Sequence, residues 1–166
     1  MEYISSDTNV WLDFMAIDRI ELPFRLPFVY LMNNDAIEDE LLTPGLGPAL
    51  RGLGLVGVDM TIEEFELAME YGARHPRLSI HDRVALSIAK IRNIILLTGD
   101  GALRKAAQEE GVKCIGTIRI LDLLYEGEYI EAGECRYCLE ELERQNGGKV
   151  RLPKYELRSR IEHLQS

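Results

Sequence analysis

Short apolar segments alternate with longer amphipathic segments along this chain. Residues 94–97 are four consecutive apolar residues, which is typical of a parallel strand covered on both faces. The longer segments carry apolar residues on one helix face, as Val10, Phe14 and Ile17 do at i, i+4, i+7 spacing. The alternation predicts an α/β three-layer sandwich, with a central parallel sheet of four to five strands flanked by helices. We predict strands at residues 2–6, 28–32, 56–58, 94–97 and 112–115, and helices at residues 10–16, 36–42, 61–74, 82–92, 102–110, 118–125, 132–144 and 154–164.

Glycine-rich stretches separate some of these elements. Residues 45–57 are expected to form a connector that leads into the short third strand, and residues 146–148 a linker. We predict two units, a domain at residues 1–126 and a C-terminal helical extension at residues 127–166 that packs on the domain or projects from it. No apolar run approaches the roughly 20 residues of a membrane span, and the first residues lack the layout of a signal peptide. A cytoplasmic protein with no membrane contact is expected.

The formal net charge of this chain of 166 residues is −9. Such a charge repels nucleic acid and argues against tight binding through a broad basic surface, although a bound cation can reverse the sign locally. Basic residues concentrate in the last segment, from Lys149 onward, which contains the predicted helix 154–164. That amphipathic helix is expected to pack on its own domain. Contacts to nucleic-acid phosphates and a dimer interface are the alternatives.

Several function classes find little support in the sequence. The cysteines Cys114, Cys135 and Cys138 are expected to be free thiols, and the C-x-x-C pair within them lacks the second pair that a zinc site usually has. Residues 52–57 match G-x-G-x-x-G, yet they neither follow the first strand nor open a helix directly, so a dinucleotide-binding oxidoreductase is only a third hypothesis. No P-loop lysine and no G-x-S-x-G turn is present.

Four carboxylates stand at positions that a parallel α/β fold could gather. Asp7 and Asp100 follow predicted strands, whereas Glu40 and Asp82 belong to predicted helices. Each alone has an ordinary explanation as a helix cap, a capping-box acid or a solvated helix residue. Gathered together, they would be too costly to crowd without a proton or a cation, and their hard oxygen ligands favour magnesium or manganese. The combination predicts a divalent-cation site.

The segments around these acids resemble the PIN-domain family over residues 1 to about 125. The opening D-T-N and the later L-T-G-D are short, but jointly they are fairly specific. The resemblance implies a parallel sheet flanked by helices and Mg²⁺- or Mn²⁺-dependent cleavage of RNA, and many members are VapC-like toxins held inactive by an antitoxin. The matching segments are Asp7-Thr8-Asn9-Val10, Glu40-Leu41-Leu42, Asp82-x-x-Ala85-Leu86-x-x-Ala89 and Leu97-Thr98-Gly99-Asp100-x-x-Leu103-Arg104-x-x-Ala107.

Carried over residue by residue, the resemblance assigns the acidic cluster to Asp7, Glu40, Asp82 and Asp100. We expect Asp7, Asp82 and Asp100 to hold one or two cations. Glu40 is expected to orient a water molecule or to complete the coordination. Repulsion among the acids should raise the pKa of at least one carboxyl in the metal-free chain, so metal binding should weaken at acid pH.

The resemblance also suggests supporting residues and contains one departure. Asn9, Glu38 and Thr98 are expected to support the site, and Glu40 is preferred to Glu38 because the family's acid commonly precedes a leucine. Leu103 occupies a place where some members carry a further acid. A two-metal site would therefore have fewer ligands here.

Two functional hypotheses follow for the whole chain. The first is a metal-dependent endoribonuclease, as the toxin of a toxin–antitoxin pair, with RNA and an antitoxin protein as partners and a homodimer as the expected assembly. The second is a catalytically inactive PIN-like module that binds Arg or Lys side chains of a basic partner protein through its acidic groove. Replacing Asp82 with Asn is expected to abolish cleavage only under the first hypothesis.

Overall fold

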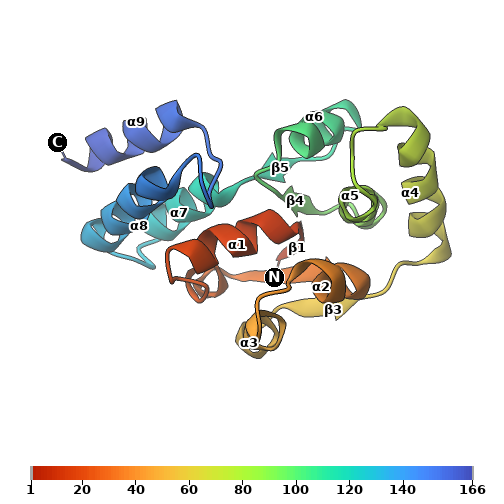
Figure 1. Cartoon of the computed structure of the whole chain (residues 1–166), viewed down its shortest axis with the longest axis horizontal. Coiled ribbons are helices and arrows are strands. Elements are labelled where there is room, and N and C mark those ends of the chain that lie inside the picture. Colours follow the sequence, from red (N-terminus) through yellow and green to blue (C-terminus); the bar gives the residue numbers. More distant parts are fainter. Residues whose placement is uncertain (1, 166) are drawn as a thin grey trace.

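Five strands form an all-parallel sheet in the computed structural model, which describes residues 2–165 (Figure 1). The strand order is β3-β2-β1-β4-β5, and helices cover both faces, so the predicted three-layer sandwich is confirmed. β5 is shorter than the strand predicted at residues 112–115 because the Val112 amide bonds back to the Ala107 carbonyl of the preceding helix. The strands are β1 (Glu2–Ser6), β2 (Phe28–Asn33), β3 (Val56–Val58), β4 (Ile95–Leu97) and β5 (Cys114–Ile115).

The helices begin largely where the sequence signals predicted them. Thr61 with Glu64 and Ser79 with Asp82 both form complete capping boxes, as their spacing predicted. None of the helices within residues 2–165 is long and apolar enough to cross a membrane. The helices are α1 (Thr8–Ala16), the short 3-10 helix η1 (Leu22–Arg25), α2 (Asn34–Glu40), α3 (Leu46–Leu53), α4 (Ile62–Arg74), α5 (Ile80–Arg92), α6 (Gly101–Glu109), α7 (Thr117–Glu126), α8 (Ala132–Gln145) and α9 (Lys154–Gln165).

The stretch at residues 45–57 was wrongly predicted to be a connector without a helix, because it contains α3. Leu46 and Leu50 stand one helical turn apart and are both buried in the main core. Gly45 and Gly54 flank the helix with positive φ angles of 82° and 130°, so these glycines mark its ends. The burial of two leucines outweighs the helix-weakening effect of the remaining glycines, which is about 1 kcal/mol each.

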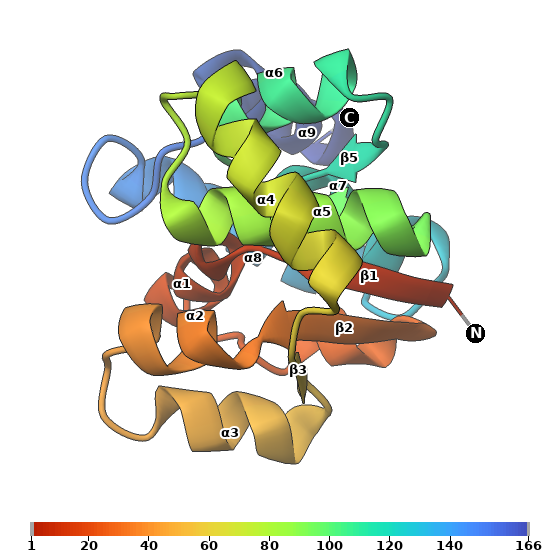
Figure 2. The ribbon, with the colours of Figure 1, turned by 90° about the vertical axis from the view of Figure 1, so that its right-hand side faces the viewer.

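Apolar strand residues face both layers of helices. In β4, Leu97 packs in one core cluster with Trp11 of α1, while Leu96 packs in a second cluster with Leu86 of α5 and Leu103 of α6. Successive side chains of a strand point to opposite faces, which is why an uninterrupted apolar run suits this strand. Figure 2 shows α4 lying across α5 on the outside of the second layer.

The two C-terminal helices pack on the core that contains α1. Leu139 of α8 and Leu157 of α9 are almost completely buried in that cluster. Cys135 and Cys138 are buried there too, and burial raises the pKa of the Cys138 thiol to about 12. Both are free cysteines that fill space in α8, which fits their interpretation as an incidental pair.

The sheet topology brings the ends of β1 and β4 together. The chain passes from β1 to β2 on one side and returns to β4 on the other, so these two neighbours flank the point where the strand order reverses. Ser6 pairs with Leu97 in the parallel register. The next residues, Asp7 and Thr98, therefore meet just beyond the carboxyl edge, where ligands bind in sheets of this kind.

Candidate active site

Asp7 is held at the sheet edge by hydrogen bonds to both carboxyl oxygens. Its backbone amide donates to the Leu97 carbonyl at 2.9 Å, which continues the β1–β4 pairing by one residue. The Thr8 amide donates to Oδ1 at 2.8 Å, and the Thr98 hydroxyl donates to Oδ2 at 2.9 Å. The residue is only 5% exposed. A carboxyl group is thus fixed in a nearly dry position.

Burial dominates the electrostatics of Asp7. Desolvation, assisted by the charges of Asp82 and Glu40, raises the pKa of Asp7 from 3.8 to about 7 despite the hydrogen bonds from Thr98 and Thr8. The expected rise is present, but burial contributes more to it than repulsion does. No Lys or Arg is among these groups. The site therefore favours either a proton or an added cation near neutral pH.

Glu40, at the end of α2, lies next to Asp7. The Thr8 hydroxyl donates to Glu40 Oε1 at 2.7 Å. Because the Thr8 amide binds Asp7, Thr8 connects the two acids. Glu40 also contributes to the raised pKa values of Asp7 and Asp82. Glu38 is exposed and contributes to neither. Of the two glutamates considered from the sequence, the structure brings Glu40 to the site.

Asp82 reaches the site from the first turn of α5. Its Oδ2 accepts a hydrogen bond from the Ser79 amide at 3.1 Å, and its own amide donates to the Ser79 hydroxyl at 3.1 Å. Burial raises the pKa of Asp82 against these bonds, and the charges of Asp100 and Glu40 add to the rise. The capping role suggested by the sequence is real, and it coexists with a place among the acids.

Asp100 caps α6 and is connected to Asp7 through Thr98. Its Oδ1 accepts from the Ala102 amide at 2.8 Å, while its own amide donates to the Thr98 hydroxyl oxygen at 3.1 Å. That hydroxyl also donates to Asp7, so Thr98 bridges the two aspartates. Leu103, the departure from the family pattern, is fully buried in the core below α6.

Burial and, after it, the charges among the four acids raise the pKa values of Asp7 and Asp82, but the four carboxyl groups do not point to one shared position. Within residues 2–165, no group of three or more His, Cys, Asp or Glu side chains is arranged so that it could hold a metal ion directly. One oxygen of each acid, or both in Asp7, is engaged in a hydrogen bond of the protein. The oxygen donor set suits Mg²⁺ or Mn²⁺ chemically. Joint binding of one cation would require side-chain movements toward a shared position.

A cavity of about 450 Å³ beside Asp100 contains residues that sequence analysis did not assign to the site. Asn9, a predicted supporting residue, lines it together with Asp13, Lys149 and Arg151. Asp13 accepts a hydrogen bond from the Thr117 hydroxyl at 2.7 Å, and burial raises the pKa of Asp13 to about 6. The signal for Asp13 was a single acid within the apolar helix at residues 10–16. The signal for Lys149 and Arg151 was the concentration of basic residues from Lys149 onward.

Replacing Thr98 with Val should loosen the site because it removes the hydroxyl shared by Asp7 and Asp100. We expect the free energy of unfolding to fall by about 1–3 kcal/mol, since one buried and one partly buried hydrogen bond lose their common partner while the side-chain shape is kept. Urea unfolding at pH 7 in EDTA measures this difference. Thr98→Ser keeps the hydroxyl and is the matched control. Equal stability of the Val and Ser variants would show that the bridge contributes nothing.

A comparison with protein families supports the family resemblance. A family model described as a PIN domain matches residues 4–166. The match includes α8 and α9, which lie beyond the segments that carried the resemblance. No curated protein and no solved structure matches the chain.

Proposed function

The chain belongs to the PIN-domain family, whose members are generally nucleases, and from this premise we propose that it is a metal-dependent endoribonuclease. The observation that carries the proposal is the buried Asp7, whose pKa is raised to about 7 at a sheet edge shared with three further acids. A carboxyl group held in this way is unfavourable for the fold alone. Positions of this kind are typical of functional sites.

The proposed metal ligands are Asp7, Asp82 and Asp100. Oδ1 of Asp82 and Oδ2 of Asp100 accept no hydrogen bond from residues 2–165, so each retains a free oxygen. Carboxylate oxygens are the usual ligands of Mg²⁺ and Mn²⁺. A bound cation of this type would lower the pKa of the attacking water and neutralise negative charge on the phosphate.

Glu40 is proposed to orient the attacking water. Its Oε1 is fixed by the Thr8 hydroxyl, which leaves Oε2 able to accept a hydrogen bond from that water. The water would then attack the phosphorus in line with the oxygen that leaves. Thr98 holds the Asp7 carboxyl in place, and the exposed Asn9 beside Asp100 is positioned to contact the RNA.

The biological setting is proposed from the family resemblance. RNA would be the substrate, an antitoxin protein would block the acidic groove, and the activity would be cytoplasmic. A homodimer is supported by three large apolar side chains on one face of α4: Ile62, Phe65 and Met69 are 81%, 52% and 65% exposed. Such a stripe is typical of an interaction surface.

A non-catalytic module is the second candidate function. The net charge of −9 favours it. The same acids would then bind Arg or Lys side chains of a partner protein. This candidate predicts that Mn²⁺ stabilises the chain while no RNA is cleaved.

Cleavage of a mixed pool of structured RNA, with Mn²⁺ or with EDTA, tests the proposal. We expect cleavage only with Mn²⁺, and we expect Glu40→Gln to lower the rate by roughly 10- to 100-fold because the water loses its orienting carboxylate. Glu38→Gln is the matched control, since it removes the same charge from an exposed position in the same helix. We expect it to cleave like the parent chain.

Each result decides between the two candidates. Metal-dependent cleavage that is weakened by Glu40→Gln and not by Glu38→Gln supports the nuclease. Equal loss in both variants would point to a general effect of charge rather than to a role of Glu40. Calorimetric binding of Mn²⁺ without cleavage of any RNA in the pool would favour the partner-binding module.

A further inference from the structure

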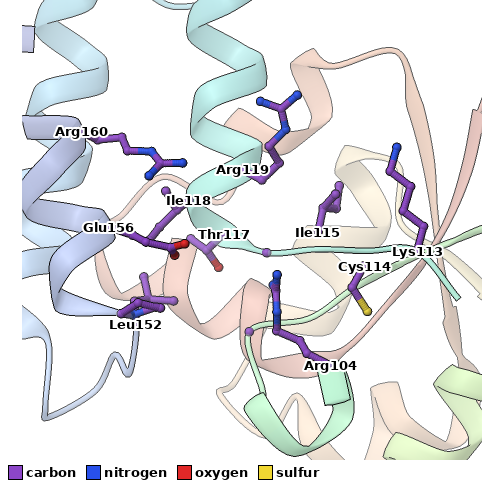
Figure 3. A pocket seen from close by; sticks show the side chains of 13 residues that line it. Arg104, Lys113, Cys114, Ile115, Thr117, Ile118, Arg119, Leu152, Glu156 and Arg160 are labelled. Atoms are coloured by element: carbon purple, nitrogen blue, oxygen red, sulfur yellow. The ribbon is translucent and has the colours of Figure 1, made fainter. Parts of the chain in front are cut away.

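A second cavity, of about 490 Å³, lies between α6, β5, α7 and the start of α9. Its lining contains four basic side chains and a single acid, although the chain as a whole carries 28 acidic and 19 basic residues. Figure 3 shows Arg104 and Arg160 extending from opposite sides toward the start of α7. The charged residues of the lining are Arg104, Lys113, Arg119, Arg160 and Glu156.

Two of the four cations form no ion pair within residues 2–165. Arg160 pairs with Asp122 at 3.1 Å, and Arg119 pairs with Glu126 at 3.4 Å. Arg104 instead donates to a neutral group, the Thr98 carbonyl, at 3.2 Å. Within residues 2–165, neither Arg104 nor Lys113 forms an ion pair. A ligand with negative charge would therefore find two free cations here.

Backbone geometry leaves room for Arg104 beside the start of α7. A Cβ atom at Gly116 would lie 2.8 Å from Arg104 Nη1 and 3.3 Å from the Thr98 carbonyl oxygen, so a larger residue there would displace the Arg104 guanidinium. Gly116 is the N-cap residue of α7 and has no side chain to cap the helix. The backbone amides of the first turn of α7, which lines the cavity, therefore have no side-chain acceptor at the N-cap. These amides add to the positive potential that the side chains establish.

The cavity continues toward the acidic site. Gly99 lines both this cavity and the one beside Asp100. The cavity beside Asp100 contributes Lys149 and Arg151, which also form no ion pair within the described part of the chain. Arg104 binds the carbonyl of Thr98, whose hydroxyl holds Asp7. A ligand that spans both cavities therefore passes directly beside the acids.

We propose that this basic cavity binds a backbone phosphate of the RNA strand, next to the phosphodiester that reaches the acidic site. The inference deepens the proposed nuclease function and rests on it for the identity of the ligand. Guanidinium and ammonium groups suit a phosphodiester because they supply charge and several hydrogen-bond donors. The cavity also explains how an acidic chain holds a polyanion, since the favourable contacts are local.

RNA binding without cleavage tests this assignment. A fluorescently labelled single-stranded RNA is titrated with the full chain carrying Asp82→Asn, in EDTA, and binding is followed by anisotropy at several salt concentrations. Adding Arg104→Gln and Lys113→Gln should raise Kd about tenfold. The association constant should also become less dependent on salt. The slope of its logarithm against the logarithm of the salt concentration should be less negative by about 1.4, the value for two lost phosphate contacts to a single strand.

The control keeps the net charge change and moves it elsewhere. Lys105→Gln with Arg136→Gln also removes two positive charges, from exposed positions of α6 and α8 outside the cavity. This control should bind RNA as the parent does. Lys113→Gln alone is the second test variant, because this side chain forms no ion pair with the residues that the structure describes, so no such pair is lost in the variant. Thermal melting verifies that each variant is folded.

The outcomes separate this inference from the nuclease proposal. The phosphate assignment would be overturned if the cavity variants and the control lowered the RNA affinity equally, or if the chain bound no RNA. Either result would stand even if the chain cleaves RNA in Mn²⁺. Selective weakening would support it even if no cleavage is found. Inorganic phosphate is the second probe: a phosphate-dependent rise in Tm that the cavity variants lose, together with unchanged RNA binding, would assign the cavity to free phosphate instead.

Discussion

Replacing Asp7 with Asn should lower the rate of RNA cleavage by roughly 10³-fold. The same replacement should stabilise the metal-free fold. Activity is lost because the amide is a poor ligand for a hard divalent cation. Stability is gained because the buried carboxylate no longer has to ionise. The pKa of Asp7, raised from 3.8 to about 7, corresponds to a penalty of about 4 kcal/mol for the ionised form.

Part of that penalty is offset in the variant. The carboxylate accepts hydrogen bonds from Thr8 and Thr98, and an amide retains only one acceptor oxygen. We therefore expect Asp7→Asn to raise the free energy of unfolding by about 2 kcal/mol at pH 8 in EDTA. A gain in stability combined with a loss of activity is the signature of a functional residue that the fold tolerates at a cost.

The effect of pH on this difference follows from the raised pKa. Below pH 3.8 the Asp7 carboxyl is protonated in the folded and unfolded chains alike, so it contributes no penalty. Between pH 3.8 and about 7 the unfolded chain releases the proton first, and stability falls as pH rises. Asp7→Asn should thus be the more stable chain above pH 7 and should lose this advantage as the pH falls from 7 toward 3.8. At pH 4 it should be the less stable chain, because only the loss of a hydrogen-bond acceptor remains.

Urea unfolding in EDTA at pH 4, 6 and 8 measures this advantage for the parent and the Asp7→Asn chain. Asp13→Asn is a useful comparison, because burial raises its pKa to about 6, yet it lies outside the proposed metal ligands. A pH-independent difference between parent and Asp7→Asn would contradict the assigned pKa. Retained cleavage by Asp7→Asn would contradict its role as a ligand.

Replacing Asp82 with Asn should also lower cleavage by roughly 10³-fold, but with little change in stability. Asp82 supplies both a proposed metal ligand and the acid of the capping box with Ser79. The amide oxygen of Asn can still accept from the Ser79 amide, so the start of α5 should persist. The expected change in the free energy of unfolding is below about 1 kcal/mol.

Asp39→Asn provides the matched control for this variant. Asp39 lies on the neighbouring helix α2, pairs with His81 at 3.1 Å and is not among the groups that raise the pKa of Asp7 or Asp82. It removes the same charge close to the site and should cleave RNA as the parent does. Full activity in Asp82→Asn would remove Asp82 from the catalytic set, whereas equal loss in both variants would indicate that net charge alone controls activity.

The acidic site and the basic cavity together address a difficulty posed by the composition. A chain with a net charge of −9 repels a polyanion at long range, so binding has to come from short-range contacts. Arg104 and Lys113 provide such contacts on one side of Gly99, and Lys149 and Arg151 provide them on the other. High salt should therefore weaken RNA binding even though the chain is acidic.

Local signals in the sequence determined most of the elements of this fold. The apolar run of β4, the alternation of strands and helices and the two capping boxes at Thr61 and Ser79 depend on neighbours in the chain, so they could be predicted directly. The helix α3 was missed because its glycine content suggested a loop. Its stability comes from the burial of Leu46 and Leu50 against distant parts of the core.

The candidate site shows the same division between local and long-range information. The sequence by itself determined which acids stand after strands and at helix starts, and the motifs around them determined the family. Only the tertiary structure decided that Glu40 rather than Glu38 joins Asp7, and that Thr98 bridges two aspartates. It also decided that Lys149 and Arg151 lie beside Asp100 and that Arg104 and Lys113 share a cavity. The physical reason is that helix, strand and cap signals act over a few residues, whereas burial, pKa shifts and cavities arise from contacts between segments far apart in the chain.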